Sequence, residues 1–257
     1  MPEATAPTVE PSHRPRSERS WIFRLLAYLV LPPMTLLGRY RIVDGEKLPS
    51  SGPFILAPNH YSEIDPLVIG VVMWKLGRMP RYLTKASLFT VPVLGWFLRK
   101  TGQIPVERGG AARGNGPLDA AERLAEQGFG VIIYPEGSLT RDPELWPMRG
   151  KTGAVRMALE ADVPLIPVAS WGAQLILPRY SKRVSLIPRK SVSVKYGDPV
   201  DLSAFRGRNL DAASLADATA LLMNDLTALV EDLRGTKAPA QRWDPNQHDQ
   251  RETGRFE

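Results

Sequence analysis

The chain has 257 residues, of which 43% are apolar, and its 33 Lys and Arg against 27 Asp and Glu give a net charge of +6. This size and composition suit one sizeable α/β domain with appendages. The basic balance favours an anionic partner such as nucleic acid, a phospholipid surface or a phosphorylated metabolite, and the lack of cysteine excludes a disulfide scaffold, a cysteine nucleophile and a thiolate metal site.

The N-terminal 40 residues predict two appendages. Residues 1–19 are rich in proline, serine and charge, which predicts a disordered basic arm. Residues 20–40 are strongly apolar but contain Arg24 and the pair Pro32 and Pro33, whereas a transmembrane helix needs about 20 uninterrupted apolar residues. We therefore expect a membrane-associating helical hairpin, made of two short pieces that lie on the bilayer surface. The alternative is a helical hairpin in the core of a soluble domain.

Residues 41–235 alternate strand-like and helix-like segments. The strand-like apolar runs are residues 53–59, 81–85, 103–107, 130–137, 163–170 and 191–197. The helix-like segments are residues 66–77, 117–128, 153–161 and an amphipathic stretch at 215–235. This order predicts an α/β domain with a mixed, largely parallel sheet covered by helices. The polar residues 236–257 predict a disordered tail.

The apolar stretch of residues 87–100 has two interpretations. It could be a second element at the membrane interface, with Trp96 and Phe97 facing lipid. An ordinary core helix after the second strand fits the same residues.

His60 stands where the apolar run at 53–59 ends, and ligands of α/β sheets bind at the carboxyl ends of the strands. A histidine can take a proton from a hydroxyl, and a carboxylate on its other ring nitrogen fixes the tautomer. Asp65 lies five residues later, before Pro66, where it also suits a helix N-cap. The spacing permits a His60–Asp65 dyad, and a purely structural histidine remains the alternative.

Other chemistries have weaker support in the sequence. A metal site needs clustered ligands, but the other two histidines, His13 and His248, lie in the two predicted disordered ends. Residues 149–153, RGKTG, imitate the end of a phosphate-binding loop, but Leu145 occupies the position of its first glycine, which argues against nucleotide binding. Nucleic-acid binding is disfavoured because the aromatic residues sit mostly in apolar runs.

Two further strand ends carry polar groups that could converge with the dyad. Arg108 follows the run at 103–107, and Glu136, Gly137 and Ser138 end the run at 130–137. Because parallel strands end at one edge of a sheet, these residues and His60 are expected to face one crevice.

In this order the stretches resemble the glycerophospholipid acyltransferases typified by 1-acylglycerol-3-phosphate acyltransferase. The family's first block, Asn-His-x-x-x-x-Asp, is matched by Asn59, His60 and Asp65, with Ser62 at the family's usual serine. Its second block, a glycine followed six positions later by arginine, is similar to the stretch from Gly102 to Arg108.

The third block of that family, Pro-Glu-Gly followed by Thr or Ser, resembles residues 135–138, which are Pro135, Glu136, Gly137 and Ser138. The fourth block, an apolar run around a proline, resembles residues 163–170 around Pro167. One position departs from the family. It commonly has arginine directly after the hydroxyl residue of the third block, whereas this chain has Leu139 there and Arg141 two positions further on.

The resemblance implies an enzyme that moves a fatty acyl group from a thioester donor, acyl-CoA or acyl carrier protein, to the hydroxyl of lysophosphatidic acid, with no cofactor or metal. His60 would be the general base and Asp65 its support. Arg108 would hold the acceptor's phosphate, and Glu136 with the Pro-Glu-Gly backbone would position its glycerol. Lys85 and Lys151 are weaker candidates for the same basic pocket.

The implied partners are a phospholipid membrane, a lysophospholipid and the acyl thioester, without nucleic acid. The implied location is the cytoplasmic face of the inner membrane. Two alternatives remain open. One is acylation of another lysolipid or of a glycolipid hydroxyl, and the other is a non-catalytic lipid-binding protein of the same fold.

Overall fold

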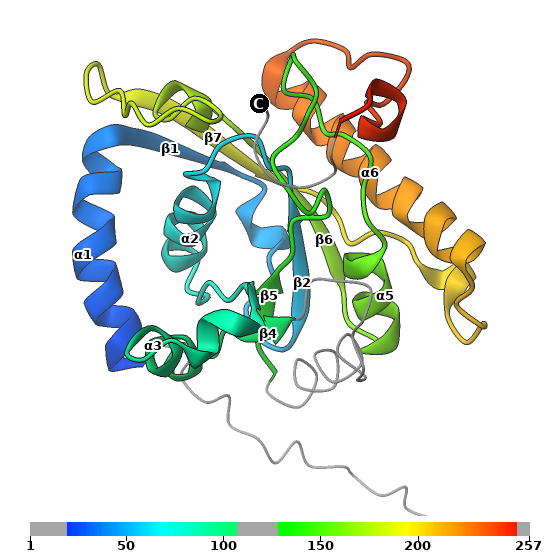
Figure 1. Cartoon of the computed structure of the whole chain (residues 1–257), viewed down its shortest axis with the longest axis horizontal. Coiled ribbons are helices and arrows are strands. Elements are labelled where there is room, and N and C mark those ends of the chain that lie inside the picture. The colour runs from blue at the N-terminus through cyan, green and yellow to red at the C-terminus, as the bar shows by residue number, and fades with distance from the viewer. Residues whose placement is uncertain (1–19, 107–127, 251–257) are drawn as a thin grey trace, which may run out of the picture.

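The strand that leads to His60 is β2 (Phe54–Pro58), and all of its residues are buried in the computed structural model, which describes residues 20–106 and 128–250 (Figure 1). Phe54 and Leu56 belong to one apolar cluster, whereas Ile55 and Ala57, on the opposite face, belong to another. A strand covered on both faces must be apolar throughout, which explains the unbroken run in the sequence.

The sheet around β2 has five strands in the order β1 (Gly38–Val43), β7 (Lys190–Tyr196), β6 (Leu165–Trp171), β2 and β5 (Gly130–Ile132). All neighbours are parallel except β6 and β7. A parallel bridge between Tyr82 and Ile132 links this sheet to the parallel pair β3 (Leu83–Lys85) and β4 (Ile104–Val106). The predicted mixed, largely parallel sheet is confirmed, and β2 to β6 all end at the same edge.

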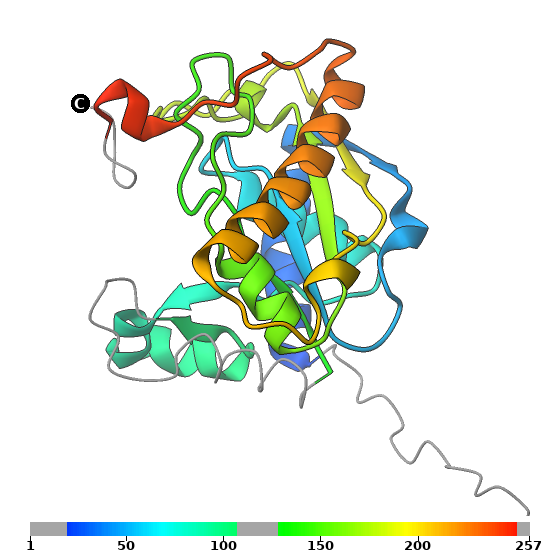
Figure 2. The same cartoon turned by 90° about the vertical axis from the view of Figure 1, so that its right-hand side faces the viewer.

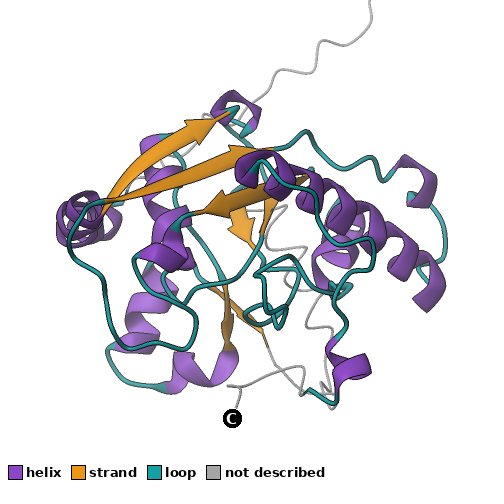
Figure 3. Cartoon of the chain, turned by 90° about the horizontal axis from the view of Figure 1, so that it is seen from above, coloured by secondary structure: helices purple, strands orange, loops and turns teal. Residues whose placement is uncertain are grey.

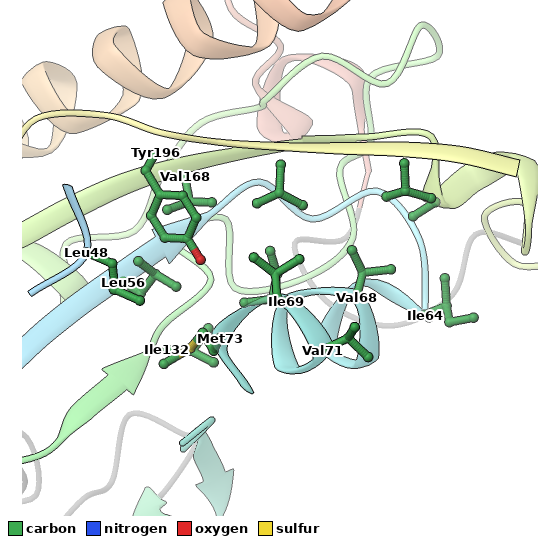
Figure 4. Packing of buried hydrophobic residues seen from close by; sticks show 14 of the residues in the cluster. Leu48, Leu56, Ile64, Val68, Ile69, Val71, Met73, Ile132, Val168 and Tyr196 are labelled. Carbon is green, nitrogen blue, oxygen red and sulfur yellow. The ribbon is translucent and has the colours of Figure 1, made fainter. Parts of the chain in front are cut away.

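Helices cover both faces of the sheet (Figures 2 and 3). On one face α2 (Asp65–Lys75) packs Val68, Ile69 and Met73 against the sheet, as Figure 4 shows. On the other face α5 (Gly153–Glu160) and α6 (Ala212–Arg234) bury a second cluster against β2 and β6. The short turn from β2 to α2 therefore joins two well-packed elements, an inner strand of the sheet and a helix packed against it.

The apolar segment near the N-terminus is one helix, α1 (Trp21–Leu37), and the predicted hairpin is wrong. Pro32 and Pro33 both lie inside it and remove the hydrogen bonds to the carbonyls of Tyr28 and Leu29. The side chains of Tyr28 and Leu29 are exposed, so water can reach these carbonyls. Packing outweighs the loss, because residues near both ends of the helix are buried in the fold: Ile22, Phe23 and Met34.

The outer face of α1 remains apolar. Its exposed large side chains are Trp21, Leu25, Tyr28, Leu29 and Leu36. None of the helices within residues 20–106 and 128–250 is long and apolar enough to cross a bilayer.

Two predicted boundaries need correction. The α/β unit begins at Gly38 rather than at residue 41, because Gly38, Arg39 and Tyr40 already pair with β7. Residues 236–250 are part of the fold, with a short 3-10 helix at Pro245–His248. Trp243 anchors them, since its carbonyl accepts the N–H of Arg149 at 2.9 Å and its ring stacks on His248. The predicted arm of residues 1–19, most of the predicted helix at 117–128 and residues 251–257 lie outside the described residues.

Residues 87–100 form the end of a 3-10 helix (Ala86–Thr90) and α3 (Leu94–Lys100) at the surface. Val91, Val93, Leu94 and Trp96 are exposed, and Phe97 is half-buried. Figures 1 and 2 place α3 next to the amino end of α1. This exposure disagrees with an ordinary core helix and fits the interfacial interpretation.

Candidate active site

His60 and Asp65 are hydrogen-bonded in the turn between β2 and α2. The distance from His60 Nδ1 to Asp65 Oδ2 is 3.0 Å. The same oxygen accepts the backbone N–H groups of Tyr61 and Ser62, each at 2.8 Å. These amides precede α2, so Asp65 does not act as the predicted N-cap and instead folds the turn back on itself. The spacing of five residues thus produces the dyad through a compact turn.

The electrostatics of the pair suit proton transfer at the other ring nitrogen. Asp65 is fully buried; burial raises the pKa of its carboxyl, and the hydrogen bond from His60 opposes that rise. A carboxylate can only accept hydrogen bonds, so Nδ1 of neutral His60 carries the proton and Nε2 keeps its lone pair. The ring stacks on Tyr134, with 4.1 Å between centroids, which holds its plane. His60 is placed to act as a general base.

Glu136 lies next to the dyad, but its side chain is turned into the protein. It is 1% exposed, one carboxyl oxygen accepts the N–H of His60 at 2.8 Å, and the other accepts the N–H of Met148 at 3.0 Å. Burial raises the pKa of Glu136 to about 8, against the lowering effect of these two bonds. The predicted contact with an acceptor's glycerol is not supported by this geometry, because both oxygens already hold backbone amides.

The Pro-Glu-Gly turn is closed around Gly137, whose φ of 73° is in the region that favours glycine. The carbonyl of Pro135 accepts the N–H of Lys151 at 2.7 Å. The Lys151 side chain lies over Gly137, since a Cβ on that glycine would be 2.9 Å from Lys151 Cδ. Ser138 follows and is half-buried. The structure thus brings Lys151, a weaker candidate from the sequence, to the turn.

The loop after β5, which contains Glu136, makes a second hydrogen bond with the backbone of His60. The carbonyl of His60 accepts the N–H of Thr140 at 2.6 Å. One loop therefore forms hydrogen bonds with both the backbone N–H and the carbonyl of His60. The sequence spacing does not indicate Thr140 or Tyr134, because each contacts His60 across more than 70 positions. It does not indicate Met148 either, because that residue reaches the site only through the buried carboxyl of Glu136.

Asn59 and Ser62 serve the architecture of the site. Asn59 Oδ1 accepts the N–H of Ser170 at 2.8 Å, and its Nδ2 donates to the carbonyl of Ser170 at 3.1 Å. Ser62 Oγ donates to the carbonyl of Leu177 at 2.6 Å. Both side chains are buried, so these bonds join the β2–α2 turn to β6 and to the segment after it. The predicted substrate contacts of Asn59 and Ser62 are not what the structure shows.

The two residues of the second block, Gly102 and Arg108, stand before and after β4 in the sequence. Gly102 precedes β4 and therefore lies at the amino end of this strand, opposite the edge that carries His60. Its φ of 66° marks a turn after α3, so its predicted role in substrate binding is replaced by a backbone role.

The basic residues singled out by the sequence lie at different places. Arg108 comes two residues after the carboxyl end of β4 but lies outside the described residues. Lys85 ends β3 at the edge that also carries His60. Arg141 is 2% exposed.

Comparisons with known proteins point to one family of enzymes. The model of the Acyltransferase family matches residues 39–171. A chloroplastic 1-acyl-sn-glycerol-3-phosphate acyltransferase of Brassica napus is 30% identical over 66% of this chain and 49% of its own length. The enzyme of that name from Bacillus subtilis is 32% identical over 54% of this chain and 66% of its own length.

The fold has a counterpart among crystal structures. The LPA acyltransferase PlsC from Thermotoga maritima superposes with a TM-score of 0.60 and 21% identity, covering 84% of this chain and 81% of that one. The chain spans about half the length of the first curated relatives that it matches.

Proposed function

Because this chain belongs to the acyltransferase family, we propose that it transfers a fatty acyl group from a thioester donor to the free hydroxyl of lysophosphatidic acid, forming phosphatidic acid. The single observation that carries the proposal is the His60–Asp65 hydrogen bond at the carboxyl edge of the sheet. The names of the relatives from Brassica napus and Bacillus subtilis support this acceptor.

In the proposed reaction, His60 Nε2 takes the proton of the acceptor hydroxyl as its oxygen attacks the thioester carbonyl. The new C–O bond forms, the C–S bond breaks, and the proton passes to the leaving thiolate. Asp65 stabilises the imidazolium that exists between these steps. General base catalysis of this kind contributes roughly a hundred- to ten-thousand-fold in rate. The step needs no covalent enzyme intermediate.

We assign the acceptor's phosphate to two basic residues, Arg108 and Lys151. Arg108 is the first candidate, because a guanidinium can form two charge-assisted hydrogen bonds with a phosphate. Lys151, which lies over Gly137, is a second source of positive charge beside the Pro-Glu-Gly turn.

Membrane attachment is the remaining part of the proposal. α3 lies next to the amino end of α1, and both helices carry exposed apolar side chains, as expected of a surface that rests on a bilayer. A lysophospholipid and an acyl chain both partition into lipid, so attachment would bring the enzyme to its substrates. We place this membrane at the cytoplasmic face, where acyl-CoA and acyl carrier protein are available.

The test is an acyl-transfer assay with the purified full chain. Lysophosphatidic acid, other lysolipids and a monoacylglycerol are offered as acceptors. Each is tested with acyl-CoA and with acylated acyl carrier protein as the donor. Acylation of lysophosphatidic acid above all the others supports the proposal. A preference for an acceptor without a phosphate monoester contradicts the proposed acceptor, and no turnover with any pair favours a non-catalytic lipid-binding protein.

A further inference from the structure

A loop near the dyad carries apolar side chains that are exposed to water. Residues 177–189 connect the 3-10 helix that follows β6 (Ala173–Leu175) to β7. Ile187 is 88% exposed, Leu186 64% and Val184 45%. Apolar groups gathered at one place on a protein surface mark an interaction site more often than chance exposure does.

The same loop is strongly basic. Between Asp162 and Asp198 the sequence contains no acidic residue, and five cations fall within residues 179–190: Arg179, Lys182, Arg183, Arg189 and Lys190. Lys182 and Arg183 precede the apolar residues, Arg189 follows them, and all three are exposed. An exposed apolar tip between cations has the chemistry of a segment that binds an anionic lipid surface.

Hydrogen bonds hold one end of the loop at the β2–α2 turn and the other end beside α1. At one end, the carbonyl of Leu177 accepts the hydroxyl of Ser62, and the N–H of Tyr180 donates to the carboxylate of Glu63 at 3.0 Å. Both contacts are in the turn that contains the dyad. At the other end, Arg189 Nε donates to the carbonyl of Gly38 at 3.1 Å, directly after α1.

We propose that residues 182–189 form a membrane-docking tip, in which Leu186 and Ile187 enter the acyl region of a bilayer while Lys182, Arg183 and Arg189 contact the phosphates of anionic phospholipids. The loop projects at the upper left of Figure 1, and a fluid bilayer accommodates a protruding apolar tip without a matching cavity. A folded partner would need such a cavity, so the exposure favours lipid.

The proposal extends the proposed function, since it adds a lipid contact in the loop that joins the end of α1 to the turn that holds His60. With the tip docked, the turn that holds His60 lies close to the lipid surface, because the same loop is hydrogen-bonded to Ser62 and Glu63. Binding to vesicles is measured without turnover, so the two proposals can fail separately. The docking tip can be disproved while acyl transfer is confirmed, and acyl transfer can be disproved while the docking tip is confirmed.

The chain lacks cysteine, so a single introduced cysteine can carry a polarity-sensitive fluorophore. We would label Ile187→Cys and, as a matched control, Leu221→Cys, an exposed position on α6 over the opposite face of the sheet. Vesicles of phosphatidylcholine with about 30% phosphatidylglycerol supply the anionic surface. We expect a blue shift and quenching by lipid-borne quenchers at position 187, and neither at position 221.

Affinity for the same vesicles provides the second measurement. Leu186→Ser with Ile187→Ser should weaken binding at least about tenfold, because two apolar side chains no longer enter the bilayer. Lys182→Gln with Arg183→Gln should weaken it about five- to twentyfold on anionic vesicles and little on pure phosphatidylcholine. Arg206→Gln with Arg208→Gln, which removes the same charge from exposed positions elsewhere, should have a smaller effect.

A vesicle-bound protein whose label at position 187 stays in water overturns the proposal, since binding then occurs through another surface. A label that responds to an acidic acyl carrier protein and not to vesicles overturns it as well, in favour of a protein partner.

Discussion

The backbone N–H of His60 donates a 2.8 Å hydrogen bond to the carboxyl group of Glu136, 76 residues away in the sequence. The second oxygen of that carboxyl accepts the N–H of Met148, and the N–H of Thr140, in the same loop, donates to the carbonyl of His60. The loop after β5 thus fixes the backbone of the proposed base, while Asp65 fixes its ring. A reaction that depends on the position of one nitrogen benefits from both constraints.

Glu136→Gln tests this contact through the pH dependence of stability. The pKa of Glu136 is about 8 in the folded chain and 4.5 in its ordinary range, so between these values the folded state holds a proton that the unfolded state has lost. The free energy of unfolding therefore falls as pH rises across this window. In Glu136→Gln this contribution, on the order of 3 kcal/mol between pH 5.5 and 8, should be absent.

Urea unfolding at several pH values provides the measurement, and Glu46→Gln, at an exposed position, is the control that should keep the wild-type slope. A Glu136→Gln protein whose stability declines with pH as steeply as the wild type would show that Glu136 is already ionised at neutral pH.

Asp65→Asn tests the support of the dyad. The amide keeps the size of the side chain and can still accept backbone N–H groups, but it loses the charge that stabilises the imidazolium. We expect kcat to fall at least about a hundredfold with little change in KM. Steady-state kinetics and a melting curve are measured together. A fall in melting temperature with kcat preserved would assign Asp65 to folding the turn alone.

Arg108→Ala tests recognition of the phosphate. Loss of a charge-assisted hydrogen bond costs about 1.5 to 3 kcal/mol, so KM for lysophosphatidic acid should rise about ten- to a hundredfold. Arg108→Lys should restore only part of the loss, because an ammonium keeps the charge but not the paired donors. The control substrate is a monoacylglycerol. Equal effects on both acceptors would mean that Arg108 is structural.

The exposed face of α1 can be tested without removing the helix. Leu25→Ser with Leu29→Ser should weaken binding to phospholipid vesicles at least about tenfold and leave the melting temperature nearly unchanged, since both side chains are exposed. Met34→Ser, at a buried position of the same helix, should instead lower the melting temperature. Unchanged vesicle binding in the double variant would remove α1 from the proposed membrane surface.

Local sequence patterns predicted what depends on neighbouring residues. The apolar run of β2 placed His60 at the end of a buried strand, and a separation of five positions was short enough for one turn to join it to Asp65. The same reasoning failed for Pro32 and Pro33, because the burial of Ile22, Phe23 and Met34 sustains a helix that prolines alone would end.

Roles that depend on distant contacts were not predictable in this way. Glu136 has the chemistry of a substrate-binding residue, and only the fold shows that its oxygens are used by His60 and Met148. The segment around Trp243 is polar enough to predict disorder, yet its contact with Arg149 orders it. Gly102 fits a family block, but its place at the amino end of β4 follows from strand direction, which one sequence does not reveal.

The most direct test of the central claim is the rate at which purified His60→Ala acylates lysophosphatidic acid, measured beside the wild type on the same vesicles. The account predicts that turnover falls at least about a hundredfold, while the melting temperature and vesicle binding stay close to wild type, because His60 Nε2 supplies the base and its backbone bonds to Glu136 and Thr140 do not require the ring. Near-normal turnover by His60→Ala would contradict it.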